Sequence, residues 1–183
     1  MADSNQIKTI QELVESLDLC NQDDFKKLGQ RLAIAPPECG QYTFYSADRY
    51  TRNCIALTDE YELLLLCWEA GQQTPVHCHN DQECWVYVVQ GEIEEELFEE
   101  TKDNPKGIKL LKEQQMPQSA ISYMNDEMGF HRLKNVHSDR SMTLHLYVKP
   151  IDGCNVYQEA SNQFEFIQLS YHSKGGNLLR TGV

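Results

Sequence analysis

The stretch of sequence that decides the fold runs from Gly71 to Gly91 and reads GQQTPVHCHNDQECWVYVVQG. It contains two histidines, His77 and His79, that are separated by a single residue. On a β-strand, residues i and i+2 point to the same side, so we expect both imidazoles to face one way. The flanking glycines are typical of tight turns, because glycine adopts turn conformations at little steric cost. The stretch therefore predicts a turn-bounded hairpin that carries half of a metal site.

Short strands are predicted on both sides of this stretch. From residue 42 onward, runs rich in Tyr, Val, Ile, Leu and Thr alternate with turn clusters, and no repeating helix separates them. This pattern is typical of an antiparallel barrel or sandwich, so we expect a mainly β protein with an antiparallel β-barrel over residues 42–175. The predicted strands are Tyr42–Tyr45, Tyr50–Leu57, Glu62–Trp68, Cys84–Val89, Ile108–Leu111, Ala120–Met124, Ser141–Val148 and Phe164–Tyr171.

Residues 1–38 have a helical pattern instead. Apolar residues fall at helical spacing from Ile7 to Leu17, which predicts a first helix. Asp23 or Asp24 is expected to cap a second helix, and Pro36 is expected to end it. A chain of 183 residues suffices for one sizeable core but not for two ordinary domains. We therefore expect residues 1–183 to form a single domain, with the helical segment packed on the barrel.

The composition limits the partners and the compartment. The net charge is −12 and the pI about 4.8, so the surface repels nucleic acid and anionic membranes, and we expect neither as a partner. The longest apolar run, Leu63–Trp68, is too short to span a membrane, and the start MADSNQIKTI lacks a signal-peptide pattern. Seven cysteines, an odd number, argue against a disulfide framework, so we predict a cytoplasmic protein. We expect a monomer, because nothing in the sequence indicates a required partner protein.

The segment Glu92–Glu100 contains six glutamates, which are interpreted as a solvated strand face and turn.

Polar residues alternate with apolar ones along one predicted strand near the C-terminal end of the barrel. Thr143, His145 and Tyr147 alternate with apolar residues, and a period of two places all three on one face. A polar face inside a barrel needs hydrogen-bond partners or a chemical function. The simpler alternative is an internal network in which these groups satisfy one another. The sharper hypothesis is that the Tyr147 phenol and the His145 imidazole position a ligand and manage a proton beside a metal.

The frame from Gly71 to Gly91 resembles the first sequence motif of the cupin superfamily, in which glycines flank a His-x-His pair. His131, followed by Asn135, resembles part of the second cupin motif, although the usual Pro and Gly before the histidine are absent. The resemblance implies a cupin-type antiparallel β-barrel in which His131 joins the histidine pair as a third metal ligand.

The metal site is predicted to contain no carboxylate ligand. Many cupins place a glutamate ligand after the histidine pair, and this chain has Cys84 at that position. Glu83 is one residue early, and on a strand this turns its side chain to the other face. We therefore predict a site of three neutral histidines, His77, His79 and His131. Such a set leaves more positive charge on the metal than a set with a carboxylate, which favours an anionic ligand such as a thiolate.

Several further strings occur in one order: Tyr50-Thr51-Arg52-Asn53, Leu66-Cys67-Trp68, His77-Cys78-His79, Cys84, Gly129-Phe130-His131-Arg132, Leu144-His145-Leu146-Tyr147 and Tyr171-His172-Ser173-Lys174. Together they closely resemble the cysteine dioxygenase family of thiol dioxygenases over roughly residues 42–175. The resemblance implies an Fe(II) cofactor and conversion of L-cysteine and dioxygen to cysteine sulfinic acid.

The resemblance also implies roles for individual residues. Arg52 matches the arginine that binds the substrate carboxylate, with Tyr50 close by. Tyr147, His145 and Cys84 match catalytic positions. In that family the matching tyrosine and cysteine can become covalently joined, so a thioether between Cys84 and Tyr147 is expected.

Three alternatives remain at this point. One is a dioxygenase for another small thiol, such as 3-mercaptopropionate; Arg52 speaks against it, because related enzymes for that thiol carry a glutamine there. A non-catalytic cupin that binds metal as a sensor or structural element is the second, and it has no evident use for Arg52 or for the Tyr147 and Cys84 pair. The third is an isomerase of sugars or keto acids, which requires a carboxylate ligand or base, and Glu83 is out of phase for that role.

Overall fold

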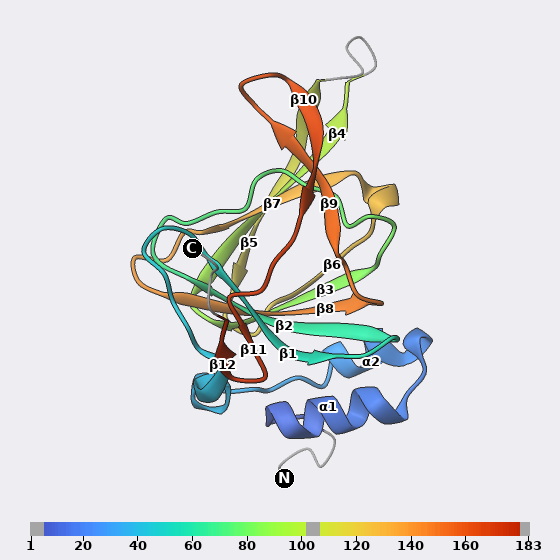
Figure 1. Ribbon diagram of the computed structural model, residues 1–183, viewed down its shortest axis with the longest axis vertical. Helices are drawn as coiled ribbons and strands as arrows, with labels where there is room; N and C mark the ends of the chain where they lie inside the picture. The colour runs from blue at the N-terminus through green and yellow to red at the C-terminus, as the bar shows by residue number, and fades with distance from the viewer. Residues whose placement is uncertain (1–5, 102–106, 180–183) are drawn as a thin grey trace.

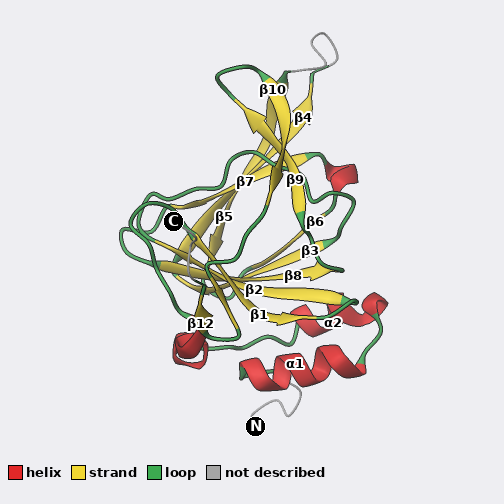
Figure 2. Cartoon of the chain, in the orientation of Figure 1, coloured by secondary structure: helices red, strands yellow, loops and turns green. Residues whose placement is uncertain are grey.

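The computed structural model describes residues 6–101 and 107–179, and most of its regular structure is β (Figure 2). A seven-stranded sheet faces a second layer made of a three-stranded and a two-stranded sheet, and helices cover the outer face of the large sheet (Figure 1). The prediction of a mainly β fold with N-terminal helices is confirmed, although the described sheets do not close into a continuous barrel. The helices are α1 (Ile10–Leu19) and α2 (Phe25–Gly29), with 3-10 helices η1 (Gln22–Asp24), η2 (Pro36–Tyr42) and η3 (Asp126–Met128). The strands are β1 (Thr51–Leu57), β2 (Tyr61–Trp68), β3 (Cys84–Gln90), β4 (Glu92–Glu100), β5 (Ile108–Pro117), β6 (Ile121–Met124), β7 (Phe130–Asn135), β8 (Ser141–Val148), β9 (Gly153–Gln158), β10 (Gln163–Gln168), β11 (Ser173–Lys174) and β12 (Asn177–Leu178).

The predicted strands are present with one exception. Tyr42–Tyr45 is not a strand, because Tyr42 ends the 3-10 helix η2 and the following residues form a loop. Strands β7, β9, β11 and β12 lie outside the predicted set.

The second predicted helix is shorter than expected. It ends at Gly29 and does not continue to Pro36. The cause is backbone pairing with the chain before α1: the Ile7 amide donates to the Arg31 carbonyl, and the Ala33 amide donates to the Ile7 carbonyl, both at 2.8 Å. These bonds require an extended backbone where the apolar spacing predicts a helix. No helix within residues 6–101 and 107–179 is long and apolar enough to cross a membrane.

An apolar layer holds the helices against the large sheet. Leu13 and Leu17 of α1 and Phe25 of α2 are buried in one cluster with Leu63 and Leu65 of β2. Burying each such side chain contributes roughly 1.5–3 kcal/mol. Since successive strand residues point to opposite faces, the residues of β2 that alternate with these leucines, such as Leu64 and Leu66, face the interior of the molecule.

The register of the seven-stranded sheet determines which side chains meet in that interior. The sheet has the order β12-β11-β1-β2-β8-β3-β6. Glu62 of β2 lies opposite Tyr147 of β8, which lies opposite Cys84 of β3. In the next inward row, His145 lies opposite Val86. Directly opposite residues project from the same face of a sheet, so the central strands bring these polar side chains to one wall.

The second layer places two of the predicted metal ligands side by side. It consists of the sheet β5-β4-β7 and the hairpin β9–β10. The backbone of His77 joins the two parts, because it forms antiparallel bridges with His131 of β7 and with Val156 of β9. Pairing on both sides fixes the position of His77 although no named strand contains it.

The chain after this bridge departs from the predicted strand. Residues 78–83 form loop and turn, with Asn80 and Asp81 at φ values of 53° and 64°. Two consecutive residues in the left-handed region end an extended segment. The Asp126 carboxylate holds this turn by accepting hydrogen bonds from the backbone amides of His79 (2.6 Å) and Asp81 (2.8 Å). The orientation of His79 therefore depends on a turn and a carboxylate, not on strand alternation.

Candidate active site

The three predicted histidines converge in the interior. His77, His79 and His131 offer ring nitrogens that all lie within 4.8 Å of one another. Their ring centroids are separated by 5.5 Å (His77–His79), 4.7 Å (His77–His131) and 4.6 Å (His79–His131). This spacing suits a single ion bound by three imidazoles.

The hydrogen bonds of two of these rings fix which nitrogen faces the centre. The Nδ1 of His77 lies 2.9 Å from the Pro75 carbonyl, which can only accept, so Nδ1 carries the proton and Nε2 has a free lone pair. The Nδ1 of His131 lies 2.9 Å from Oε1 of Glu95, a carboxylate. The Nε2 of His131 is buried, and among the described residues it has no hydrogen-bond partner. A buried, unpartnered imidazole nitrogen aimed at two other imidazoles fits a metal ligand.

Glu95 corrects the interpretation of Glu92–Glu100 as a solvated face. Glu95 is only 1% exposed, and besides His131 it accepts hydrogen bonds from Ser122 and Gln114. Burial alone raises the pKa of Glu95, but the hydrogen bonds from these three partners outweigh it and lower the pKa below its usual value. A carboxylate that holds a ligating histidine fixes its tautomer and increases its basicity. This role of Glu95 was not predicted, although its spacing of two from Ile93 places both side chains on the buried face of β4.

The imidazoles near the centre are kept neutral. Burial, with repulsion from His131 as the second cause, lowers the pKa of His77 to about 3. Burial and then the neighbouring histidines also lower the pKa of His79 well below its usual value. A neutral imidazole is the form that binds a metal, so these rings are ready to act as ligands near neutral pH.

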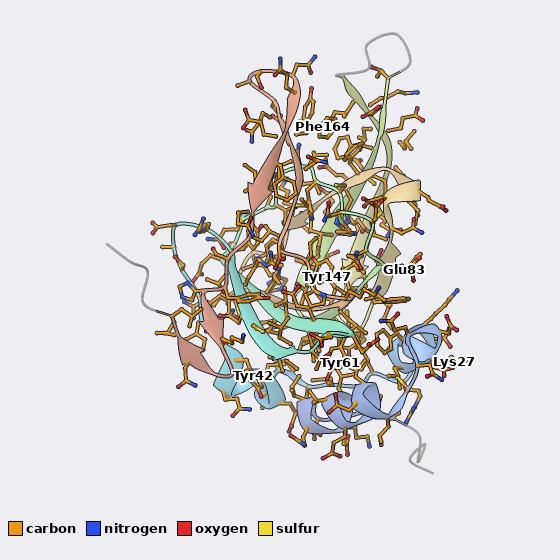
Figure 3. The ribbon with its side chains drawn as sticks, turned by 45° about the vertical axis from the view of Figure 1, so that its right-hand side comes forward. Lys27, Tyr42, Tyr61, Glu83, Tyr147 and Phe164 are labelled. Atoms are coloured by element: carbon orange, nitrogen blue, oxygen red, sulfur yellow. The ribbon has the colours of Figure 1, made fainter. Side chains whose placement is uncertain are left out.

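The wall opposite the histidines carries the predicted polar row. Thr143 Oγ1 lies 2.9 Å from His145 Nε2 and accepts a hydrogen bond from Trp68 Nε1 at 3.0 Å. The Tyr147 side chain, labelled in the middle of the molecule in Figure 3, lies in the interior. Its ring is 5.6 Å from the His79 ring, which places the phenol beside the histidine cluster. Burial raises the pKa of Tyr147 well above its usual value, so the phenol stays protonated and can donate a hydrogen bond.

Cys84 and Tyr147 face each other across neighbouring strands. They are direct partners in the β3–β8 register, and Cys84 is fully buried with a free thiol. Burial raises the pKa of the Cys84 thiol, and a side-chain hydrogen bond with Tyr147 opposes this in part. The two groups are therefore in direct contact, beside the histidine cluster.

A small cavity lies between the two walls. Its volume is about 40 Å³, and its lining includes Tyr50, Arg52, His77, His145 and Tyr147. This exceeds the ~10–15 Å³ that one water molecule needs, and it leaves room only for a small ligand. Arg52 is the cationic side chain of this lining, and its guanidinium contacts Oε1 of buried Glu62 at 3.1 Å. No role was predicted for Glu62, which directly precedes the run LLLL.

The fold and the site define a metal-binding cupin with a centre of three histidines. The sequence profile of the family described as "Cysteine dioxygenase type I" matches residues 2–160. The chain belongs to this family, and it is therefore an oxidoreductase of the non-haem iron dioxygenase class.

Similar proteins agree with this assignment. "Cysteine dioxygenase type 1" of Danio rerio is 29% identical over 181 residues, covering 93% of this chain and 86% of the relative. The protein of the same name from Homo sapiens is 26% identical over 177 residues, covering 92% and 88%. A crystal structure of an uncharacterized conserved protein with a double-stranded β-helix domain from Klebsiella pneumoniae superposes with a TM-score of 0.50 at 13% identity. It covers 72% of this chain and 93% of that chain, and this likeness concerns the fold alone.

Proposed function

We propose that this chain is an iron-dependent cysteine dioxygenase that converts L-cysteine and dioxygen into cysteine sulfinic acid, with both oxygen atoms added to sulfur. The observation that carries the proposal is the small cavity lined by both Arg52 and His77, where His77 belongs to the cluster of three convergent histidines. The family assignment supports the same reaction. In this scheme His77, His79 and His131 hold the iron.

The donor set suits this chemistry. Fe(II), when bound, would supply the redox chemistry with dioxygen and a position for the substrate thiolate. The three neutral imidazoles add no negative charge, so an anionic sulfur is favoured at the centre. The unpartnered Nε2 of His131 is the nitrogen that faces the ion.

The remaining residues bind and orient the substrate. Arg52 forms a charged hydrogen bond with the substrate carboxylate, and the adjacent Tyr50 completes that end of the cavity. The Tyr147 hydroxyl donates a hydrogen bond to the reacting groups beside His79. His145, held at Thr143, keeps this side of the cavity polar. The cavity is small, so it leaves little room for water beside the substrate and restricts the orientations of the reactants.

We further propose that Cys84 and Tyr147 become joined by a thioether. The reaction forms a carbon–sulfur bond between the phenol ring and Sγ and removes two hydrogens, which dioxygen takes up as the oxidant. The cross-strand contact of the two side chains supports this. The link would fix the phenol in place and so assist catalysis without being essential to it.

The same proposal describes a single-domain, cytoplasmic monomer that needs neither nucleic acid nor membrane. The shared apolar cluster of helices α1 and α2 with β2 supports one domain over residues 1–183. The seven free cysteines suit a reducing compartment, and the net charge of −12 disfavours polyanionic partners.

Oxygen uptake by the iron-loaded protein tests this function. Among L-cysteine, cysteamine and 3-mercaptopropionate, we expect oxygen uptake to be fastest with L-cysteine and to yield the sulfinic acid. Of these three thiols, only L-cysteine carries both an amine and a carboxylate that Arg52 can bind. Faster uptake with 3-mercaptopropionate would favour the dioxygenase for that thiol. No thiol-dependent uptake by protein that retains iron would favour a non-catalytic metal-binding cupin.

A further inference from the structure

Glu62 is a buried carboxylate directly behind Arg52, which lines the cavity. It is 0% exposed, at the start of the central strand β2. In the sheet it lies directly opposite Tyr147, so both side chains project into the same interior. An ionised carboxylate at such a place is costly unless it is paired and hydrogen-bonded.

Both oxygens of Glu62 have partners. Oε1 accepts a hydrogen bond from Nη2 of Arg52 at 3.1 Å, and Oε2 accepts one from the backbone amide of Ile151 at 2.9 Å. Tyr171 also forms a side-chain hydrogen bond with Glu62, and its ring lies 5.8 Å from the Arg52 guanidinium carbon. The carboxylate is thus anchored to the backbone on one side and holds the arginine on the other.

We propose that Glu62 is a positioning residue that holds the Arg52 guanidinium toward the substrate carboxylate and so sets the preference for thiols that carry one. This inference rests on the proposed function, in which Arg52 binds that carboxylate. Glu62 occupies one Nη2 donor, and a guanidinium has five N–H donors, so a second carboxylate can bind the rest of the fork.

An amide cannot replace this carboxylate. Gln at position 62 presents one oxygen and one NH2 group, so either Arg52 or the Ile151 amide would face a donor instead of an acceptor. Arg52 would then lose its fixed orientation. The effect should reach only substrates that use the arginine, because Glu62 acts through it.

The test compares Glu62→Gln, Arg52→Gln, the double variant and the control Glu60→Gln, each as iron-loaded protein. Glu60 is a nearby exposed glutamate whose carboxylate accepts a hydrogen bond from Gln22 and not from Arg52. We expect Glu62→Gln to raise the KM for cysteine about tenfold, the size of one charged hydrogen bond, with kcat nearly unchanged. Cysteamine, which lacks the carboxylate, should show no such rise. Anaerobic titration with cysteine should give the same loss in binding, and Glu60→Gln should behave as wild type.

The double variant separates positioning from damage to the fold. Arg52→Gln leaves Glu62 as a buried charge without its ion partner, so adding Glu62→Gln should raise the Tm of Arg52→Gln. The KM for cysteine should be no higher in the double variant than in Arg52→Gln, because Glu62 acts only through Arg52.

Two results would overturn the inference. One is equal rises of KM for cysteine and cysteamine in Glu62→Gln. The other is a fall of the KM for cysteine in Glu62→Gln, which would mean that Glu62 limits the charge of Arg52 instead of orienting it. A wild-type protein without cysteine-dependent oxygen uptake would instead contradict the proposed function itself. An unchanged cysteine preference in Arg52→Gln would contradict the assigned role of the arginine.

Discussion

The histidine wall and the facing wall each contain one buried carboxylate behind the cavity lining, but the two walls are braced in different ways. On the histidine wall, Glu95 fixes His131, and the backbone of His77 is paired on both sides. On the facing wall, Glu62 holds Arg52. The register of β2, β8 and β3 places Tyr147 opposite Glu62 and Cys84 opposite Tyr147. Because each wall has its own supporting contacts, we expect that one wall can be perturbed without the other. Changes on the histidine wall should alter iron content, whereas changes on the facing wall should alter turnover or substrate binding.

The largest effect is expected from removing a metal ligand. His131→Ala should lose most of its iron and nearly all activity, because two remaining imidazoles cannot hold the ion in the same geometry. Elemental analysis of the purified variant measures this, with His137→Ala as the control, since His137 is exposed and does not belong to the ligand set. Full iron content in His131→Ala would contradict the ligand assignment.

On the facing wall, Tyr147→Phe should separate turnover from iron content. We expect kcat to fall on the order of 100-fold, because the phenol that donates to the reacting groups is gone, while iron stays near the wild-type level. Loss of iron from Tyr147→Phe would show that the two walls do not act separately.

The variant Cys84→Ser should keep reduced activity but lose the thioether to Tyr147. Its peptides should therefore show no species lighter by two hydrogens. A free Cys84 thiol in every active wild-type molecule would refute the link.

In contrast to Tyr147→Phe, the variant Glu95→Gln should weaken iron binding and leave substrate binding nearly unchanged. An amide oxygen is a weaker acceptor for His131, so iron affinity should fall about 10–100-fold, while the KM for cysteine of the iron-loaded fraction changes little. Competition with a chelator measures the affinity. Glu94→Gln is the matched control, because Glu94 lies next to Glu95 on β4 but is partly exposed and bonded to Gln115. Equal losses in both variants would show that the charge of the strand matters and not the contact with His131.

The smallest effect concerns acid stability. Burial, followed by repulsion from His131, lowers the pKa of His145 in the folded state well below its usual value. Its contribution is therefore present above the unfolded pKa of about 6.5 and is lost as the pH falls below it, because the unfolded chain then binds more protons. In iron-free protein, His145→Gln should reduce the slope of unfolding free energy against pH below 6.5 by about 1.4 kcal/mol per pH unit. Denaturant titrations at several pH values check this, and an unchanged slope would mean that His145 is protonated in the folded protein.

The histidine wall and the polar row could be predicted from the sequence because their patterns are local. The His77-x-His79 spacing and the alternation of Thr143, His145 and Tyr147 are short-range signals, and the structure brings these groups to facing walls. His79 reaches this cluster for a different reason than expected, since a turn held by Asp126, and not strand alternation, orients it.

The two buried carboxylates could not be predicted in the same way. Glu95 stands among other glutamates, and only its pairing with His131 across β4 and β7 distinguishes it from its solvated neighbours. Glu62 stands at a strand end, where a charge is ordinary, and its partners Arg52 and Ile151 are distant in sequence. Contacts of this kind depend on sheet order, which the sequence pattern does not determine.

The most direct test of the central claim is the fate of labelled dioxygen in a single reaction. Iron-loaded protein should be incubated with L-cysteine under 18O2, and the product should be analysed by mass spectrometry. We expect cysteine sulfinic acid in which both sulfinate oxygens carry the label, because both atoms of dioxygen go to a sulfur held between the histidines and Arg52. A product with one labelled oxygen, or cystine alone, would contradict it.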